Sequence, residues 1–194
     1  MSEFRSRWRS PGPAKFVCYP TPLLAPFSIT APDAEWLASC GLPAWAAPNM
    51  HFFCEATDRL PPPADQYGVP LIGVGPNLGM IGSTGEDWPI YVTSAGSTGV
   101  YCVELESPNR HRLLNSTIQQ LADTLLAYNE AVEAALEYGN ARGDRDAWRR
   151  HRYPIAFDTR LKDQIGLIDP PAILPDAYWG LHFADPDWRH LTSA

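Results

Sequence analysis

The chain has 194 residues, of which 45% are hydrophobic, and a formal net charge of −7. This length suffices for one sizeable hydrophobic core, and the composition is ordinary for a globular protein. No apolar run approaches the roughly 18 residues that a membrane span needs, and the N-terminal residues lack the apolar stretch of a secretory signal. We therefore expect a cytoplasmic protein without a membrane segment.

Residues 1–28 are rich in proline and show no periodicity, which predicts a flexible or draped N-terminal arm ahead of a single domain over residues 29–194. Thr30 is suited to cap a first helix over Ala31–Cys40. Trp36, Leu37 and Cys40 would form its inner face. Gly41 would end the helix, and the following Leu-Pro step prevents its continuation.

Short segments rich in Val, Ile, Tyr and Leu then predict strands. They are His51–Cys54, Leu71–Val74, Ile90–Thr93, Val100–Leu105 and Arg112–Leu114. The Ser-Ala-Gly-Ser-Thr-Gly sequence at 94–99 predicts a hairpin connection between two of them. Within Val100–Leu105, we expect the face with Tyr101, Val103 and Leu105 to be the more buried one.

The longest predicted helix follows the last of these strands. Ser116 is suited to cap it, with Gln119 three residues later to close a capping box. An apolar face then recurs at three- and four-residue steps, and Gly139 is a natural helix stop. The face consists of Ile118, Leu121, Leu125, Tyr128, Val132 and Leu136.

Two shorter helices are expected after it. Asp144–His151 could form a short basic helix, and Thr159 could cap a helix that runs to about Ile168. The Asp169-Pro170-Pro171 sequence would end that helix, because proline lacks the N–H that a helix requires.

The negative charge is concentrated in residues 21–108. This range contains one basic residue, Arg59, against nine acidic residues. The nine are Asp33, Glu35, Glu55, Asp58, Asp65, Glu86, Asp87, Glu104 and Glu106. A surface so poor in Lys and Arg repels nucleic acid and attracts basic partners. A solvated acidic surface without any partner is the alternative interpretation.

The sequence shows no pattern of a metal site or an enzyme. The 4 cysteines include no Cys-x-x-Cys pair, and the 5 histidines include no His-Glu-x-x-His pair. Because each cysteine stands beside apolar residues, we expect buried thiols in a reducing compartment. The glycines of residues 73–79 have the wrong spacing for a dinucleotide loop. We therefore predict no catalytic residues, no cofactor and no metal.

An arginine-rich segment lies at residues 141–152. It contains Arg142, Arg145, Arg149, Arg150 and Arg152, together with Trp148. Such a basic and aromatic cluster could contact nucleic acid. Because Asp144 and Asp146 interleave with it, we favour pairing within the chain or contact with a partner protein.

Several short motifs, taken in order, resemble the SUKH superfamily of Smi1/Knr4-like bacterial immunity proteins, and its SUKH-4 branch most of all. The resemblance covers roughly residues 29–183 and depends on the order and spacing of the motifs. They are Cys40-Gly41-Leu42-Pro43, Ile81-Gly82 before Ile90-Tyr91-Val92, Gly99-Val100-Tyr101, Leu114-Asn115-Ser116, Leu167-Ile168-Asp169-Pro170 and Trp179.

This resemblance implies an α+β fold with a largely antiparallel sheet backed by helices. It also implies a non-catalytic protein that binds and neutralises a polymorphic toxin, often a nuclease or a nucleic-acid deaminase. The motif residues themselves are expected to end strands, cap a helix and pack the core. An intracellular scaffold or regulatory module of the same fold is the alternative function.

The partner-binding residues expected from charge lie in the acidic region. Glu86, Asp87 and Trp88, in the loop between Gly82 and Pro89, are the first candidates, because interfaces often use a Trp anchor with a charged rim. Glu104 and Glu106 are the second candidates. The alternative for Trp88 is an aromatic side chain that packs the loop or the core. The expected partner is a basic protein toxin rather than nucleic acid or a membrane.

Overall fold

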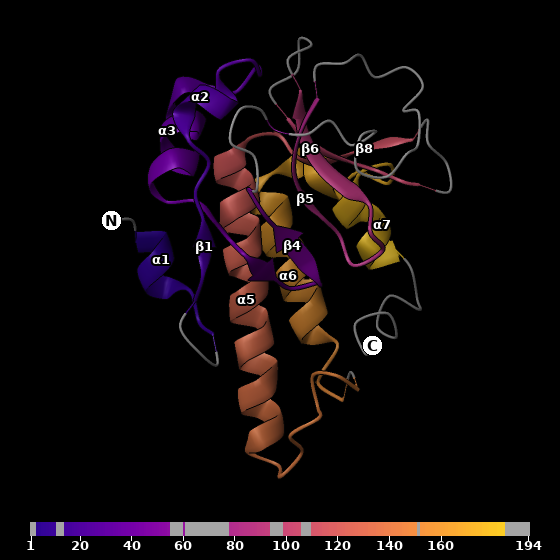
Figure 1. Cartoon of the computed structure of the whole chain (residues 1–194). Coiled ribbons are helices and arrows are strands. Elements are labelled where there is room, and N and C mark those ends of the chain that lie inside the picture. The colour runs from indigo at the N-terminus through magenta and orange to yellow at the C-terminus, as the bar shows by residue number, and fades with distance from the viewer. Residues whose placement is uncertain are drawn as a thin grey trace.

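The computed structural model describes residues 3–10, 14–54, 60, 78–93, 99–105, 110–150 and 152–184. Within these residues, six strands form one antiparallel sheet in the order β3-β4-β5-β6-β7-β8 (Figure 1). They are β3 (Trp45–Ala46), β4 (Met50–Phe52), β5 (Leu78–Ser83), β6 (Pro89–Thr93), β7 (Val100–Val103) and β8 (His111–Asn115). The expected α+β fold, with an antiparallel sheet backed by helices, is confirmed.

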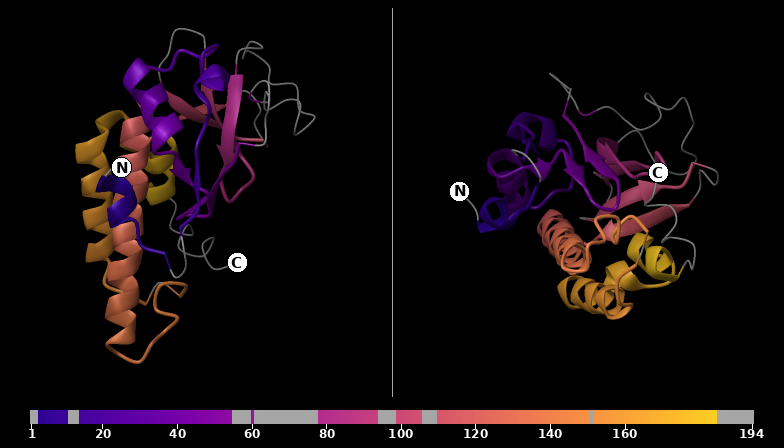
Figure 2. Two further views of the ribbon diagram at one scale, coloured as in Figure 1. Left: turned by 60° about the vertical axis from the view of Figure 1, so that its left-hand side comes forward. Right: turned by 90° about the horizontal axis from the view of Figure 1, so that it is seen from below.

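Helices cover one face of this sheet, as the view from below in Figure 2 shows. They are α5 (Ile118–Asn140), α6 (Ala156–Ile168), the 3₁₀ helix η1 (Pro170–Ile173) and α7 (Tyr178–Ala184). The core forms where apolar side chains of the sheet, such as Ile90 and Leu114, meet Leu121 and Leu125 of α5. Each such side chain contributes about 1.5–3 kcal/mol when it is fully buried, so this contact positions α5 on the sheet.

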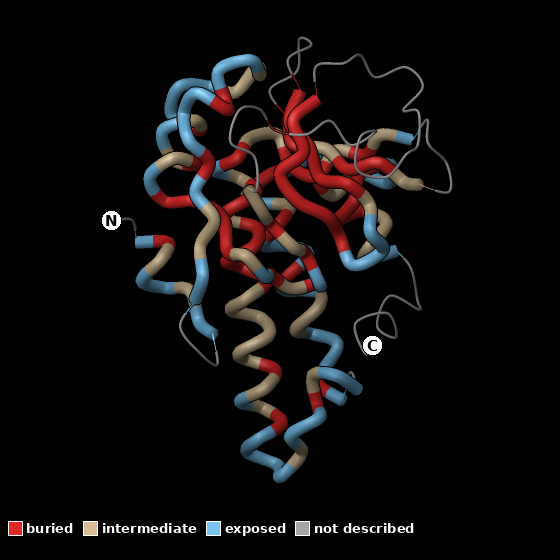
Figure 3. The backbone as a smooth tube through the Cα atoms, in the orientation of Figure 1, coloured by how far each residue is buried: buried red, intermediate tan, exposed pale blue. Residues whose placement is uncertain are grey.

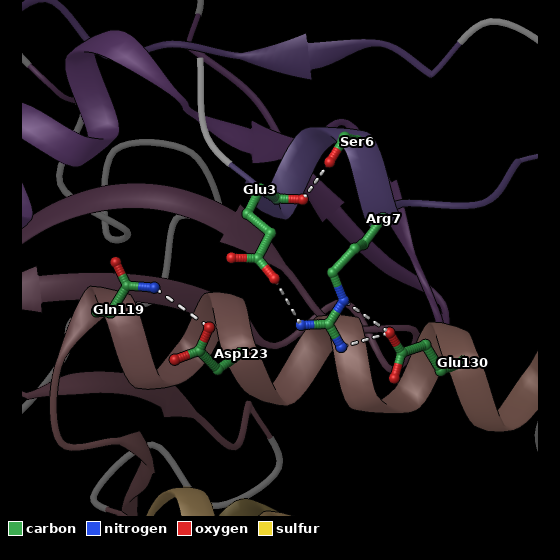
Figure 4. A network of polar contacts seen from close by, with 6 residues as sticks. All are labelled: Glu3, Ser6, Arg7, Gln119, Asp123 and Glu130. Atoms are coloured by element: carbon green, nitrogen blue, oxygen red, sulfur yellow. Dashed lines mark hydrogen bonds and ion pairs between the residues drawn. The ribbon is translucent and has the colours of Figure 1, made fainter.

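The N-terminal residues flank this core. They form α1 (Glu3–Arg7), β1 (Phe16–Val17), α2 (Thr21–Leu24), α3 (Ala31–Ser39) and β2 (Leu42–Pro43), with β1 and β2 paired as a separate two-stranded sheet. Arg7 binds Glu130 of α5 at 2.6 Å, which ties α1 to the long helix (Figure 4). Of the two alternatives for residues 1–28, the described residues follow the draped one. The domain division at residue 28 stays a prediction, although Tyr19 and Leu24 are buried in the main core.

The first predicted helix is confirmed at both ends. The Thr30 side chain accepts a hydrogen bond from the Asp33 N–H, as a helix cap should. Gly41 adopts a φ of 69°, a left-handed conformation that glycine adopts without strain. A β-carbon at Gly41 would also overlap the carbonyl oxygen of Val17, so this turn brings β2 against β1.

Strand β5 was not expected from the sequence. Its glycines lower the strand propensity of the segment, yet all six of its residues are buried. A β-carbon at Gly79 would overlap the ring of Phe27, and one at Gly82 would overlap the carbonyl oxygen of His51. The glycines are therefore required by close packing, which local propensity does not reveal. The predicted strand Leu71–Val74 lies outside the described residues.

The expectation for the buried face of β7 was wrong. Val100 and Cys102 are fully buried in the main core, because their face of the sheet is the one that the helices cover. Tyr101 and Val103 lie on the other face, in a smaller apolar cluster with Leu78 and Tyr91. Both faces of β7 are apolar, so alternation within the strand could not identify the helix side.

The long helix begins and ends slightly later than expected. Thr117, not Ser116, is the capping residue, and its side chain accepts a hydrogen bond from the Gln120 N–H. Gly139 lies inside the helix, where a β-carbon would overlap Ala147 and the carbonyl oxygen of Asp144. The left-handed residue after the helix is Gly143, with a φ of 74°. Gly139 therefore permits close packing of the following turn.

The segment after α5 also differs from expectation. Residues 145–150 form turns, so the basic helix expected to start at Asp144 is absent from the described part of this segment. Helix α6 begins at Ala156, ahead of Thr159, whose hydroxyl donates to the Ile155 carbonyl at 3.3 Å inside the helix. Turns 141–150 and the adjoining ends of α5 and α6 extend below the sheet and are less buried than the upper half of α5 (Figure 3).

Candidate partner-binding surface

A tight turn between β5 and β6 displays two carboxylates. The Thr84 N–H donates to the Trp88 carbonyl at 2.9 Å, and the Asp87 N–H donates to the Thr84 carbonyl at 3.0 Å. Asp87 has a φ of 59°, which aspartate tolerates better than most residues. Glu86 and Asp87 are both exposed. The turn therefore holds two negative charges in fixed positions at the protein surface.

Trp88 is half-buried and supports this turn from below. Its ring lies edge-on to the ring of Tyr178 in α7, with 6.3 Å between the ring centres, and packs against the main core. This geometry matches the packing alternative, in which Trp88 fixes the loop. Contact with a partner through its remaining exposed edge stays a prediction.

Glu104, one of the second pair of candidates, is less available for contact with a partner. Glu104 accepts from Arg112 at 2.6 Å, and the two side chains are only 19% and 9% exposed, respectively. Arg112 also donates to the Asp176 carbonyl at 3.3 Å. The charge of Glu104 is therefore largely compensated within the fold. Glu106 lies outside the described residues.

Trp45, an exposed tryptophan, lies beside the acidic turn. It is not among the candidates expected from the sequence. Trp45 in β3 is 68% exposed and contacts the ring of His51 edge-on. A β-carbon at Gly85, in the acidic turn, would overlap the side chain of Asn49, so the turn and the β3–β4 hairpin touch. The signal in the sequence was the short Pro-Ala-Trp-Ala-Ala-Pro run, in which no neighbouring side chain is large enough to cover the indole.

The pKa of His51 also reflects the closeness of the β3–β4 hairpin to the acidic turn. Partial burial lowers the pKa of His51, while the negative charge of Asp87 opposes this shift. The imidazole of His51 therefore lies within the field of the acidic turn. Since His51 contacts Trp45 and feels the charge of Asp87, we group Trp45, His51, Glu86 and Asp87 and call them the Trp45 surface.

The arginine-rich turn is mostly paired within the chain. Arg152 binds Asp144 at 2.5 Å, Arg150 lies 4.0 Å from Asp146, and the Arg142 guanidinium stacks over the Tyr138 ring. This pairing follows the intramolecular alternative. Trp148 packs between Tyr128 and Tyr153. The indole therefore holds the turn against α5 and is not a free contact surface.

Four of the motif residues, Asn115, Ser116, Asp169 and Trp179, meet in one polar cluster. The carboxylate of Asp169 accepts from the Ser116 N–H at 2.6 Å, from the Ser116 hydroxyl at 2.8 Å and from the Asn115 amide at 3.1 Å. Trp179 donates its indole N–H to Asn115 at 3.2 Å. Asp33 accepts from the Gln119 N–H at 3.1 Å. Two carboxylates therefore lie at the positive end of the α5 dipole, a favourable position.

The described residues were also compared with the expectations for metal sites, cysteines and membrane spans. Across the described ranges, no group of three or more His, Cys, Asp and Glu side chains is arranged to hold a metal ion. Cys40 and Cys102 are buried as expected, but Cys18 is exposed, so that prediction was wrong for this thiol. None of the described helices combines the length and the hydropathy needed to cross a bilayer.

Comparison with protein-family models identifies the family. The model described as SUKH-4 immunity protein matches residues 9–185, which include the polar cluster and the Trp45 surface. The chain belongs to the SUKH-4 immunity protein family. Comparison with the curated proteins and with solved structures gave no significant match. Membership of this family implies a role in toxin immunity and a protein toxin as the partner of this SUKH-4 protein.

Proposed function

We propose that this SUKH-4 protein binds a basic toxin in the bacterial cytoplasm and neutralises it by covering its active surface, without catalysis of its own. The toxin is a nuclease or a nucleic-acid deaminase, because such enzymes carry basic surfaces for a polyanionic substrate. The acidic residues of the range 21–108 take the place of the phosphate charges. Electrostatic complementarity of this kind speeds association and favours the correct partner.

The observation that carries this proposal is the exposed pair Glu86 and Asp87 on a hydrogen-bonded turn. Because the turn is already ordered by its own bonds and by Trp88, its charges bind a partner without a further cost of ordering the loop. Glu104, paired with Arg112, and Glu106 would extend the acidic surface around this centre. Of these candidates, Glu86 and Asp87 have the largest expected effect.

The test first asks whether a toxin domain is encoded beside the gene of this protein, and then uses that domain as the probe; the lack of such a domain would favour the scaffold or regulatory role. Cells that produce the toxin domain should grow only when the wild-type protein is also present, and the purified pair should form a one-to-one complex. The double variant Glu86→Lys/Asp87→Asn should associate about 10-fold more slowly at low salt, with a smaller difference at high salt. Asparagine is chosen at position 87 because it tolerates the left-handed backbone there.

A matched control separates local charge from net charge. The variant Asp163→Lys/Glu137→Gln makes the same change in net charge at exposed positions on α6 and α5. It should associate at nearly the wild-type rate. If both variants slow association equally, the acidic turn is not the contact. If the wild-type protein neither binds nor protects against the toxin domain, the proposed function is wrong, and a scaffold or regulatory role takes its place.

A further inference from the structure

A pocket opens beside Trp45 and His51. It has a volume of about 460 Å³ and lies between β1 and the β3–β4 hairpin. Its lining combines the apolar side chains of Phe16, Val17, Trp45 and Phe52 with polar atoms, and includes the exposed residue Cys18. This volume lies within the usual range for binding pockets, which is about 300–1,000 Å³. The pocket is therefore large enough for a bulky side chain of a partner.

The exposed indole of Trp45 suggests that this pocket contacts a partner. A side chain that is 68% exposed contributes little to the stability of the fold, so packing within the chain does not explain why a tryptophan stands there. Trp is among the residues most enriched at the energetic centres of protein interfaces, where it packs beside a pocket within a rim of polar groups. The pocket, the indole and the exposed carboxylates provide these parts in one place.

The charges around the pocket have a defined order. Trp45 pairs with His51, and His51 pairs with Ser83 at the start of the acidic turn. On the opposite side, the Lys15 carbonyl accepts from the Ala44 N–H at 2.8 Å, which places Lys15 beside β3. The sequence of groups across the surface is therefore Lys15, Trp45 with the pocket, His51 and then the carboxylates. A partner segment that carries positive charge is attracted to one side and repelled from the other.

We propose that the toxin inserts an aliphatic or aromatic side chain into this pocket, against Trp45, and places a neighbouring Lys or Arg on Glu86 and Asp87. This inference rests on the proposed function and specifies how the same surface recognises its partner. The side chain in the pocket mainly slows dissociation of the complex, since most affinity differences at one interface arise from the dissociation rate. The carboxylates supply the rate of association and the orientation of the toxin segment.

The first experiment measures the rates of binding of the neighbouring toxin domain to the wild type and to Trp45→Ala. The variant should dissociate about 30-fold faster, the usual scale for an interface anchor, with little change in the association rate. Leu167→Ala is the matched control, because Leu167 is 85% exposed on α6 and away from the pocket. Its dissociation rate should stay within about twofold of the wild type. The Glu86→Lys/Asp87→Asn variant should show the opposite division, with a change mainly in association.

A second measurement needs no substitution. The Cys18 thiol lines the pocket and is exposed, so a maleimide reagent should modify it in the protein alone. A bound toxin domain should slow this modification at least 10-fold, as followed by mass spectrometry of the Cys18 peptide. Phosphate or salt at the same ionic strength should not protect it.

The outcomes distinguish a failure of the pocket contact from a failure of the proposed function as a whole. If the toxin domain binds the wild type but Trp45→Ala dissociates at the same rate, or Cys18 reacts equally fast in the complex, the pocket is not the contact and the proposed function stands. If the toxin domain does not bind the wild type, both are wrong. If the protein alone forms a dimer that Trp45→Ala abolishes, the pocket serves a second copy of the chain and the inference is overturned.

Discussion

Substitution of Asp169 tests whether the buried polar cluster holds the helices to the sheet. Asp169 is 0% exposed, and its carboxylate accepts three hydrogen bonds from Asn115 and Ser116. Asn115 is the last residue of β8 and Ser116 lies between β8 and α5, whereas Asp169 directly follows α6. The carboxylate therefore joins the sheet, the start of the longest helix and the end of its neighbour.

The expected cost follows from what the substitution leaves behind. A hydrogen bond to a charged group contributes about 1.5–3 kcal/mol, and a buried donor without an acceptor costs about 1–3 kcal/mol. Asp169→Ala leaves the Ser116 N–H and one Asn115 amide hydrogen in the core without this acceptor. Because the substitution also removes the cost of burying a charge, we expect a net loss of about 3–5 kcal/mol. Asp169→Asn keeps one acceptor oxygen and should lose about half as much.

Urea unfolding followed by circular dichroism measures this loss. The midpoint should fall for Asp169→Ala while the slope of the free energy against urea stays the same. Asp163→Ala, at an exposed position on α6, is the control and should change stability by no more than about 0.5 kcal/mol. A loss below about 1 kcal/mol for Asp169→Ala, with an unchanged slope, would show that this carboxylate does not hold the helices to the sheet, because water then satisfies the donors of the cluster.

Two further predictions concern α5 and α7. Alanine normally stabilises a helix by about 1 kcal/mol relative to glycine. Gly139→Ala should instead destabilise the fold by about 1–3 kcal/mol, because the new β-carbon would overlap the backbone of Asp144. A gain in the thermal stability of the protein would contradict this prediction. His182 is half-buried among aromatic rings, and its desolvation lowers the pKa of the imidazole to about 3, so the imidazole stays neutral in the fold at a pH where it is already protonated in the unfolded chain. The stability that this group adds is complete above about pH 6.5 and is lost as the pH falls toward 3, by roughly 1–2 kcal/mol between pH 7 and pH 5. Urea unfolding of His182→Gln should show a correspondingly flatter dependence on pH, and an equal slope for both proteins would show that His182 is solvated.

Much of the helical structure could be predicted from local sequence. Thr30 and Gly41 mark the ends of α3 because a side-chain cap and a left-handed glycine act over only a few residues. The apolar period of α5 likewise depends on its own residues. The prediction of its cap missed by one position, since Ser116 and Thr117 are both suitable hydroxyls. Ser116 binds Asp169 instead, a residue 53 positions later in the chain.

The candidate site was predicted only in part. Glu86 and Asp87 were identified from charge, and the structure places both at the surface. Composition could not distinguish Trp88 from Trp45, because the exposure of a tryptophan depends on which elements pack over it. Tyr178 of α7 covers Trp88, whereas Trp45 lies in a short strand beside small residues and remains 68% exposed.

Local patterns in the sequence were enough to indicate the family, the acidic character of residues 21–108 and both ends of α3, because motifs, charge and caps are properties of short segments. Tertiary structure alone decided that Gly82 belongs to a buried strand, that Val100 and Cys102 face the helices and that Trp45 lies beside the acidic turn. Each of these facts depends on contacts between residues far apart in the chain. Such contacts are set by packing of the whole core, which no local pattern encodes.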